Sequence, residues 1–431
     1  MTDRERIVQA DKRRVWHPYT PMRQYVEGGD PLCISRAQGS RLFDTEGRSF
    51  LDGNSSWWTA ALGHGHPRLI AALGRQAEAM CHVPLAGIAH EPAALLAEEL
   101  VAVAPEGASR VFFSDDGSTA VEVALKLALQ YWHQNGRPDR KRFVALGGAF
   151  HGDTLGAAAL GGVEVFRRPF AGVLLDCIHV PVTPPGYEQA FAALERVLRD
   201  SADSLAAVVL EPIVQGAAGM RMYSPELLKR AAELAERADV FLVLDEVFTG
   251  YGRTGPMWAL EHAGVRPDLM CTAKAFSGGM LPMGATLVSE RIYEGFLGDP
   301  ERAFYYGHTY CGNPLGAAVA REVLAVYRDE DLLARAVPKA RRITEAFDRL
   351  RGVAGVEGVR SLGMIGALDL GGDAGYLAGS GWRVYAEALR RGAYLRPLGN
   401  VVYVAPPINI EDADLEELLG IVEESLRAVA G

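Results

Sequence analysis

Short apolar runs alternate with amphipathic helical segments through the middle of the chain, and this pattern constrains the fold more than any other feature. Each run is followed by a turn and then by apolar residues at helical spacing. Such alternation predicts an α/β fold with a mainly parallel sheet covered by helices on both faces. Ligands bind at the carboxyl ends of the strands in sheets of this kind. The predicted strands are residues 110–114, 142–146, 206–212, 241–245 and 268–272.

Lys274 follows the last of these strands and is the only charged side chain in residues 269–289. Apolar surroundings disfavour the ammonium form, so we expect the pKa of Lys274 to be lowered. An unprotonated amine can attack a carbonyl substrate or hold an aldehyde cofactor such as pyridoxal phosphate. The alternative is a lysine whose stem packs on apolar surface while its amine reaches water.

Two other positions lie at strand ends and can share a crevice with Lys274. Gly117 and Ser118 come after a strand and begin a helical pattern, where backbone amides can bind a phosphate. An ordinary helix cap is the alternative. Asp245 ends an apolar strand, and a carboxylate there is costly to bury unless it has a cationic partner. A protonated pyridine nitrogen would be such a partner.

Composition excludes several classes of protein. The 431 residues carry a net charge of −10, and no basic run is longer than residues 12–14 or 140–142, which argues against nucleic-acid binding. The charged segment 1–14 is neither a signal peptide nor a membrane anchor. Five scattered cysteines favour reduced thiols in the cytoplasm. His64 and His66 lack ligand partners at suitable spacing, so no metal site is predicted.

Two longer motifs identify a family resemblance. LVLDEVFTGYGRTG at residues 242–255 and GHTYCGNPLG at residues 307–316 flank Lys274, and together they resemble the class III aminotransferases. The resemblance implies a fold type I enzyme that depends on pyridoxal phosphate. It further implies a large domain with a seven-stranded type of sheet and a smaller α/β domain. We expect an N-terminal segment at residues 1–60, the large domain at 61–320 and the small domain at 321–431.

Cofactor-binding roles follow from the resemblance position by position. Lys274 would attach the cofactor aldehyde and then move a proton between substrate and cofactor, and Asp245 would keep the pyridine nitrogen protonated. Gly117 and Ser118 would hold the phosphate. Phe150 would stack on the cofactor, although the family usually has tyrosine there, so a phenolic hydrogen bond is lost.

The phosphate site would be completed by a second subunit. His308 and Thr309 would reach it from the partner, so the resemblance implies a homodimer. Adenosylmethionine-using members usually have proline at the position of His308, and histidine there is similar to a branch that takes its amino group from lysine.

Five further motifs narrow the resemblance: WHPYT at 16–20, DGNSSWW at 52–58, FHGDT at 150–154, EPIVQGAAGMRMY at 211–223 and LRPLGNVVYVAPP at 395–407. On these motifs the chain is similar, within the class, to the adenosylmethionine-8-amino-7-oxononanoate aminotransferases. This resemblance implies transamination of 8-amino-7-oxononanoate to 7,8-diaminononanoate in biotin biosynthesis, with S-adenosylmethionine as amino donor. Lysine as donor, another ω-amino acid or diamine aminotransferase, an aminomutase, and a binding protein that retains the fold stay open.

The same resemblance assigns the substrate-binding residues. Arg396 would pair with the substrate carboxylate, a task that suits a planar guanidinium. Asp153 and Arg253 are further neighbours of the site, and for Arg253 a surface ion pair stays open. The residues that would surround the aliphatic chain are Tyr19, Trp57, Trp58, Phe150 and Gly307.

Overall fold

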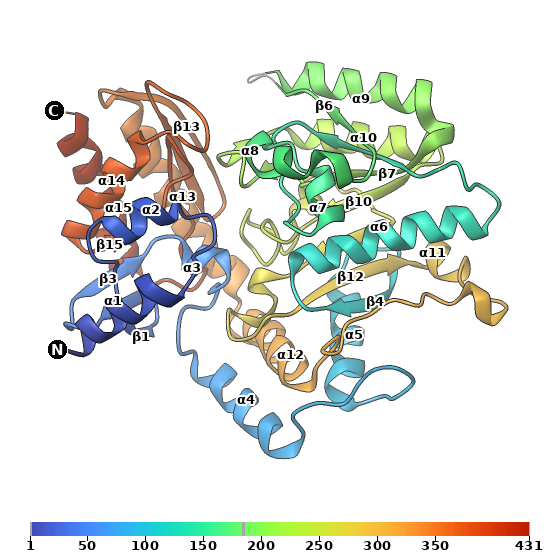
Figure 1. The fold of residues 1–431 in the computed structure, drawn as a ribbon, viewed down its shortest axis with the longest axis horizontal. Coiled ribbons are helices and arrows are strands. Elements are labelled where there is room, and N and C mark those ends of the chain that lie inside the picture. The colour runs from blue at the N-terminus through green and yellow to red at the C-terminus, as the bar shows by residue number, and fades with distance from the viewer. Residues whose placement is uncertain (1, 183–185, 431) are drawn as a thin grey trace.

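A seven-stranded β-sheet forms the centre of the computed structural model, which describes residues 2–182 and 186–430 (Figure 1). All strands run parallel except β12, which is antiparallel to both of its neighbours. The predicted α/β fold with a mainly parallel sheet is thereby confirmed. The strand order is β4 (Ala108–Ser114), β12 (Gly284–Ser289), β11 (Leu269–Thr272), β10 (Phe241–Asp245), β7 (Leu205–Leu210), β5 (Arg142–Leu146) and β6 (Cys177–Val180).

Both faces of the sheet are covered. Side chains of β7 and β10 alternate between two cores, with Val208 and Leu242 in one and Val209 and Val243 in the other. Residues buried on both faces give the continuous apolar runs seen in the sequence. No helix within the described residues is long and apolar enough to cross a membrane. The covering helices are α5 (Glu91–Val103), α6 (Gly117–Gln134), α7 (Leu155–Leu160), α9 (Tyr187–Ser201), α10 (Pro225–Arg237), α11 (Glu290–Glu294) and α12 (Pro314–Asp329).

A second group of elements lies beside the large sheet, at the left of Figure 1. Its antiparallel sheet has the order β13 (Val356–Leu362), β14 (Ile365–Leu370) and β16 (Val401–Val404). The helices of this group are α13 (Leu332–Arg349), α14 (Ser380–Arg391) and α15 (Asp412–Ala430). The predicted domain boundary between residues 320 and 321 falls inside α12 and stays a prediction.

The N-terminal segment joins this C-terminal group through a shared sheet. Its order is β1 (Ile34–Gln38), β2 (Arg41–Asp44), β3 (Ser49–Asp52) and β15 (Ala393–Tyr394), and the β3–β15 pairing is parallel. Blue and red ribbons therefore lie side by side in Figure 1. The remaining elements are α2 (Met22–Glu27), α3 (Ser55–Trp58), α4 (Pro67–Ala79), α8 (Glu164–Arg167), β8 (Val214–Gln215) and β9 (Arg221–Met222).

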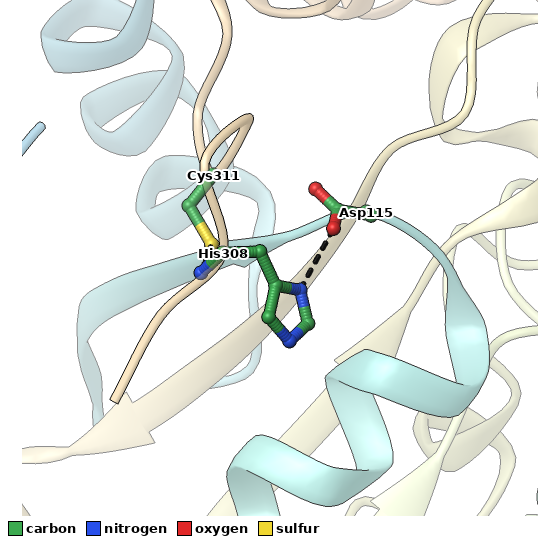
Figure 2. A group of neighbouring side chains, drawn as sticks. All are labelled: Asp115, His308 and Cys311. Carbon is green, nitrogen blue, oxygen red and sulfur yellow. Dashed lines mark hydrogen bonds and ion pairs between the residues drawn. The ribbon is translucent and has the colours of Figure 1, made fainter. Parts of the chain in front are cut away.

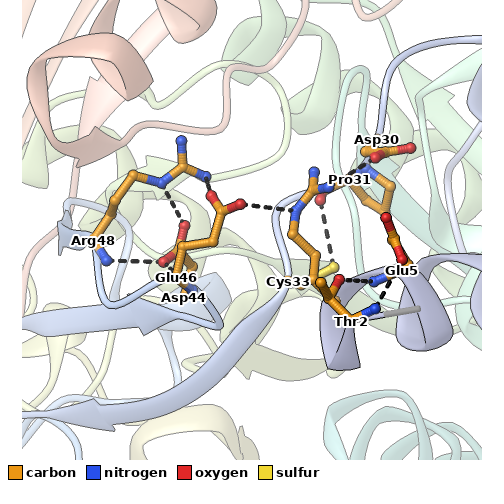
Figure 3. Close-up of polar contacts among 9 residues, drawn as sticks. Thr2, Glu5, Asp30, Pro31, Cys33, Asp44, Glu46 and Arg48 are labelled. Carbon is orange, nitrogen blue, oxygen red and sulfur yellow. Dashed lines mark hydrogen bonds and ion pairs between the residues drawn. The ribbon is translucent and has the colours of Figure 1, made fainter.

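Polar contacts fix the N-terminal helix α1 (Asp3–Arg14) on this sheet (Figure 3). Thr2 caps the helix, and Arg4 Nη1 lies 2.9 Å from Asp30 Oδ2. Arg4 Nε lies 3.8 Å from Glu46 Oε1 in the turn between β2 and β3. In the turn after β2, Arg48 Nε lies 2.7 Å from Asp44 Oδ2. The ion pairs of Arg4 are partly exposed, and such pairs contribute only about 0–1 kcal/mol each, so they orient the helix more than they stabilise it. After α1 the chain brings Tyr19 to the segment that follows β5, where its ring centroid lies 5.3 Å from that of Phe166.

Candidate active site

A cavity of about 660 Å³ opens at the carboxyl ends of the strands. Residues after β4, β10 and β11 form one side, and the N- and C-terminal segments form the other. Gly307, His308 and Thr309 are not in its lining. The predicted site residues that line it are Tyr19, Trp57, Trp58, Gly117, Ser118, Phe150, Asp245, Lys274 and Arg396.

Lys274 begins a short 3-10 helix directly after β11, and part of its side chain faces the cavity. Its Nζ lies 4.3 Å from the ring centroid of Trp58 and 5.9 Å from that of Phe248. Burial lowers the pKa of Lys274 to about 8, although the charge of Asp245 opposes the shift. Lys274 also has a φ of 46°, a strained backbone conformation that is common at functional sites. The prediction of a desolvated lysine is confirmed.

Asp245 ends β10 and is almost completely buried. Its Oδ1 accepts a hydrogen bond of 3.0 Å from the amide of Val247, and its Oδ2 lies 2.7 Å from Nδ1 of His151. Burial works against a charged imidazole, but the hydrogen bond and charge of Asp245 prevail and raise the pKa of His151. Asp245 therefore has a partner inside the chain that the sequence interpretation did not foresee.

A second acid, Glu211, directly follows β7 and lines the cavity. Its two oxygens accept hydrogen bonds from the amides of Phe150, at 3.1 Å, and Gly216, at 2.8 Å. Burial raises the pKa of Glu211 to about 7, and the positive charge of His151 opposes that shift. Two acids, an imidazole and the Lys274 amine thus share one desolvated region.

The N-terminus of α6 forms a small cup at the cavity wall. Asp116 is the N-cap, and its Oδ1 accepts a hydrogen bond of 2.8 Å from the amide of Thr119. The first amides of a helix, here those of Gly117 and Ser118, have no partner within the helix and can bind an anion. A Cβ on Gly117 would lie 2.7 Å from Cγ1 of Val247, so a side chain there would clash. The helix cap is therefore present, and anion binding by Gly117 and Ser118 stays a prediction.

Aromatic side chains surround Arg396 at the outer end of the cavity. Its Cζ lies 4.7 Å from the ring centroid of Trp57, and its Nη2 lies 3.4 Å from Tyr376 Oη. Among the described residues, no carboxylate forms an ion pair with Arg396. Phe166 and Tyr376 were not predicted, yet their ring centroids lie 4.8 Å apart in the same wall.

The adjacent tryptophans face different parts of the cavity. Trp57 is 39% exposed and lies under Arg396, whereas Trp58 is buried against Lys274 and donates from Nε1 to Tyr403 Oη at 3.1 Å. Residues 55–58 all have positive φ values, so the backbone that carries the two rings is strained. Both rings line the cavity, but only Trp57 belongs to its outer end.

Asp153 and Arg253 were predicted as further neighbours of the site, and the structure treats them differently. Asp153 lines the cavity and accepts a hydrogen bond from Tyr19 Oη, and burial together with this contact raises the pKa of Tyr19. The alternative of a surface ion pair for Arg253 is wrong, because this side chain is buried. Its Nη1 donates to the carbonyls of Pro406, at 2.7 Å, and Met364, at 3.4 Å. Burial lowers the pKa of Arg253 to about 10.

The loop before α12 lies outside the cavity lining. Gly307 and Thr309 are exposed, and Nδ1 of His308 lies 2.7 Å from Asp115 Oδ2 in the same chain (Figure 2). Tyr305 and Tyr310 are 81% and 62% exposed. Exposed aromatic residues in one loop are typical of a contact surface.

Known proteins match this chain over almost its whole length. A sequence model of the family described as aminotransferase class-III matches residues 25–426. The adenosylmethionine-8-amino-7-oxononanoate aminotransferase of Synechococcus elongatus is 42% identical over 96% of this chain and 98% of its own length. The protein of the same name from Geobacter sulfurreducens is 36% identical over 100% of this chain and 99% of its own.

Solved structures agree with the sequence comparisons. The crystal structure of the adenosylmethionine-8-amino-7-oxononanoate aminotransferase from Methanocaldococcus jannaschii has a TM-score of 0.95, 34% identity and 99% coverage of both chains. The ω-transaminase of Pseudomonas jessenii in complex with PMP has a TM-score of 0.93 and 26% identity over 98% of both chains. The chain belongs to the class III aminotransferases, a family of pyridoxal-phosphate-dependent enzymes.

Proposed function

We propose that the chain transfers an amino group to 8-amino-7-oxononanoate and forms 7,8-diaminononanoate in biotin biosynthesis, with S-adenosylmethionine as the donor. The observation that carries the proposal is Arg396, a guanidinium without a carboxylate partner among the described residues, set in an aromatic wall beyond Lys274. A long aliphatic substrate with a terminal carboxylate matches that arrangement. The names of the relatives support the same substrate.

The cavity has groups that fit each part of pyridoxal phosphate. The cup at Gly117 and Ser118 suits the phosphate, since a Cβ on Gly117 would fill part of the space beside Val247. Asp245 suits a protonated ring nitrogen, and the amine of Lys274 suits the aldehyde. Phe150 lines the cavity and offers a ring for stacking.

When bound there, the cofactor supplies an electron-withdrawing ring for the substrate carbon. Asp245 keeps negative charge at the ring end, and His151 holds that carboxylate in place through its 2.7 Å contact. The Nζ of Lys274 accepts a proton from the substrate and returns it, because a pKa of about 8 leaves a useful neutral fraction near neutral pH. Trp58 covers the amine and limits its contact with water.

Arg396 and its aromatic neighbours would set the orientation of the substrate. The guanidinium binds the carboxylate, while Tyr19, Trp57 and Phe150 contact the chain between the two ends. A carboxylate there gains charge-assisted hydrogen bonds that the unliganded guanidinium lacks. We also propose that Gly307 of the partner subunit lies beside the substrate, where its lack of a side chain would leave room for the aliphatic chain.

Arg396→Ala is expected to lower kcat/KM for 8-amino-7-oxononanoate by about 10- to 150-fold, because a hydrogen bond to a charged group contributes about 1.5–3 kcal/mol. Steady-state kinetics with this substrate measures the effect. Arg110→Ala is the matched control, since Arg110 also lies over a ring, that of Tyr293 at 4.1 Å, but outside the cavity. An unchanged kcat/KM in Arg396→Ala would show that Arg396 does not bind the carboxylate.

The low pKa of Lys274 predicts how quickly the cofactor-free protein takes up pyridoxal phosphate. Only the neutral amine attacks an aldehyde, so the rate should rise with pH and level off above about 8. An ordinary lysine would continue to gain reactivity to about pH 10. Stopped-flow absorbance between pH 6 and 10 measures the profile. A rate that still rises steeply above pH 9 would contradict the desolvated state of the amine.

A donor panel tests the function. Purified protein is incubated with 8-amino-7-oxononanoate and one of adenosylmethionine, lysine, glutamate or alanine, and 7,8-diaminononanoate is measured by mass spectrometry. We expect product with adenosylmethionine. Turnover with lysine alone would replace only the donor, whereas failure with every donor would reject this substrate.

We further propose a cytoplasmic homodimer in which His308 and Thr309 complete the phosphate cup of the partner. Exposed Thr309, Tyr305 and Tyr310 in one loop support a contact surface there. Five free cysteines support a reducing compartment. Sedimentation equilibrium should give twice the chain mass, and Tyr310→Asp should shift the protein toward monomers.

A further inference from the structure

A triad of metal-ligating side chains, Asp115, His308 and Cys311, lies beside the start of α6 (Figure 2). His308 and Cys311 come from one turn, in which the amide of Cys311 donates to the His308 carbonyl at 3.2 Å. Asp115 comes from the loop between β4 and α6. One ligand atom of each residue lies within 4.8 Å of the others, and all three residues are half-buried.

The turn already orients the cysteine sulfur. The amide of His308 donates a hydrogen bond of 3.1 Å to Sγ of Cys311. Hydrogen bonds of this kind stabilise metal ligands from outside the first coordination sphere. The other ring nitrogen of His308, Nε2, lies 3.0 Å from Tyr306 Oη, which restrains the imidazole. Nδ1 lies 2.7 Å from Asp115 Oδ2 but has no hydrogen-bond partner among the described residues. The ring orientation and the sulfur position are therefore both set by groups that would not bind the metal.

We propose that Asp115, His308 and Cys311 bind one zinc ion in each protomer. Thiolate, imidazole and carboxylate are the three ligand types of zinc sites, whereas magnesium and calcium prefer oxygen alone. A tetrahedral zinc site separates its ligand atoms by about 3.3–3.8 Å, given metal–ligand distances of about 2.0–2.3 Å. The His308–Asp115 contact of 2.7 Å must therefore open slightly, which rotation of the two side chains achieves. Water fills the fourth position.

The position of the site suggests what the ion would do. Asp115 also lines the cavity and precedes Gly117 by two residues, so its negative charge lies close to the proposed phosphate cup. Zinc would neutralise this carboxylate and tie the side chain of His308 to the start of α6, while the neighbouring Thr309 and the backbone of His308 stay available to the phosphate cup of the partner. On the proposed function, both effects favour retention of an anionic cofactor. We expect zinc to slow the release of pyridoxal phosphate from the loaded protein.

Zinc content of the untagged holoprotein tests the site directly. The protein is first treated with a chelator and then dialysed against zinc chloride in phosphate-free buffer. Bound zinc is measured by inductively coupled plasma mass spectrometry. We expect about one zinc per protomer. Asp115→Asn and Cys311→Ala should weaken binding by about 100-fold or more, since loss of even an outer-shell partner costs about 10- to 100-fold. Cys81→Ala is the control, because Cys81 is a free, exposed cysteine outside the triad.

X-ray absorption at the zinc edge provides a readout that does not depend on variants. One sulfur should appear among the ligands of the wild-type protein. Three results would each overturn the site. They are a wild-type protein that does not retain zinc, zinc affinities of Asp115→Asn and Cys311→Ala that equal the wild-type affinity, and a zinc coordination shell without sulfur. Zinc content is independent of transamination, so an inactive protein that binds zinc would refute the proposed function and leave the metal site intact.

Discussion

Replacing Lys274 by alanine is expected to abolish transamination and to remove the yellow colour of the purified protein. Loss of a proton-transfer group alone slows a reaction by about 10²- to 10⁴-fold. Alanine also removes the amine that would hold the cofactor covalently. Borohydride reduction followed by peptide mapping should find pyridoxal phosphate on Lys274 in the wild-type protein and nowhere in the variant.

Lys339→Ala is the matched control for this experiment. Lys339 is also a buried lysine whose pKa is lowered by burial, but it lies in α13, outside the cavity. Its replacement should leave the colour and the transamination rate unchanged. A colourless wild-type protein, or a Lys274→Ala protein that keeps covalent cofactor, would overturn the assignment of Lys274.

The sequence was sufficient for residues whose environment is set by their own chain neighbours. Strands 142–146 and 241–245 were predicted with the bounds of β5 and β10, because each is an uninterrupted apolar run between turns. Once those strands were known, the rule for parallel sheets placed Asp245 and Lys274 at one edge. The pocket lining agrees with that placement.

Residues that depend on distant partners could not be found in this way. His151 lies 94 residues before Asp245, and no local pattern indicates their contact. Phe166 and Tyr376 meet across two segments far apart in sequence. The strand β12 was also missed, since an antiparallel strand directly after a turn breaks the alternation of strand and helix. These features arise only from the packing of the complete chain.

Helix α13 shows how packing can outweigh a local signal. The helical spacing of apolar residues predicts a helix from Pro338 to Leu350. The structure begins the helix at Leu332 and keeps Pro338 inside it. Buried Leu332 and Ala336 lie before the proline and pack with the core. Their burial compensates for the hydrogen bond that Pro338 cannot donate.

Asp245→Asn is expected to lower kcat by about 10²- to 10⁴-fold. Asparagine preserves the shape of the side chain and can still accept the hydrogen bond from the amide of Val247, but it removes the negative charge. Loss of one partner from a buried charge pair costs about 3–5 kcal/mol, and each 1.36 kcal/mol changes a rate tenfold. Both His151 and a protonated cofactor nitrogen would lose that partner. Single-turnover kinetics separates this loss from weaker substrate binding.

Cofactor uptake gives a second, independent readout for Asp245→Asn. The charge of Asp245 raises the pKa of Lys274 against the effect of burial, so its removal should lower that pKa further below 8. The pH midpoint for uptake of pyridoxal phosphate should therefore move to lower pH. Asp268→Asn is the control. Asp268 is a mostly buried acid whose carboxylate accepts a hydrogen bond of 2.9 Å from the amide of Leu242. It lies just before β11, at the opposite end of that strand from Lys274. If Asp245→Asn kept both the rate and the midpoint of the wild-type protein, the negative charge at the end of β10 would have no part in the chemistry.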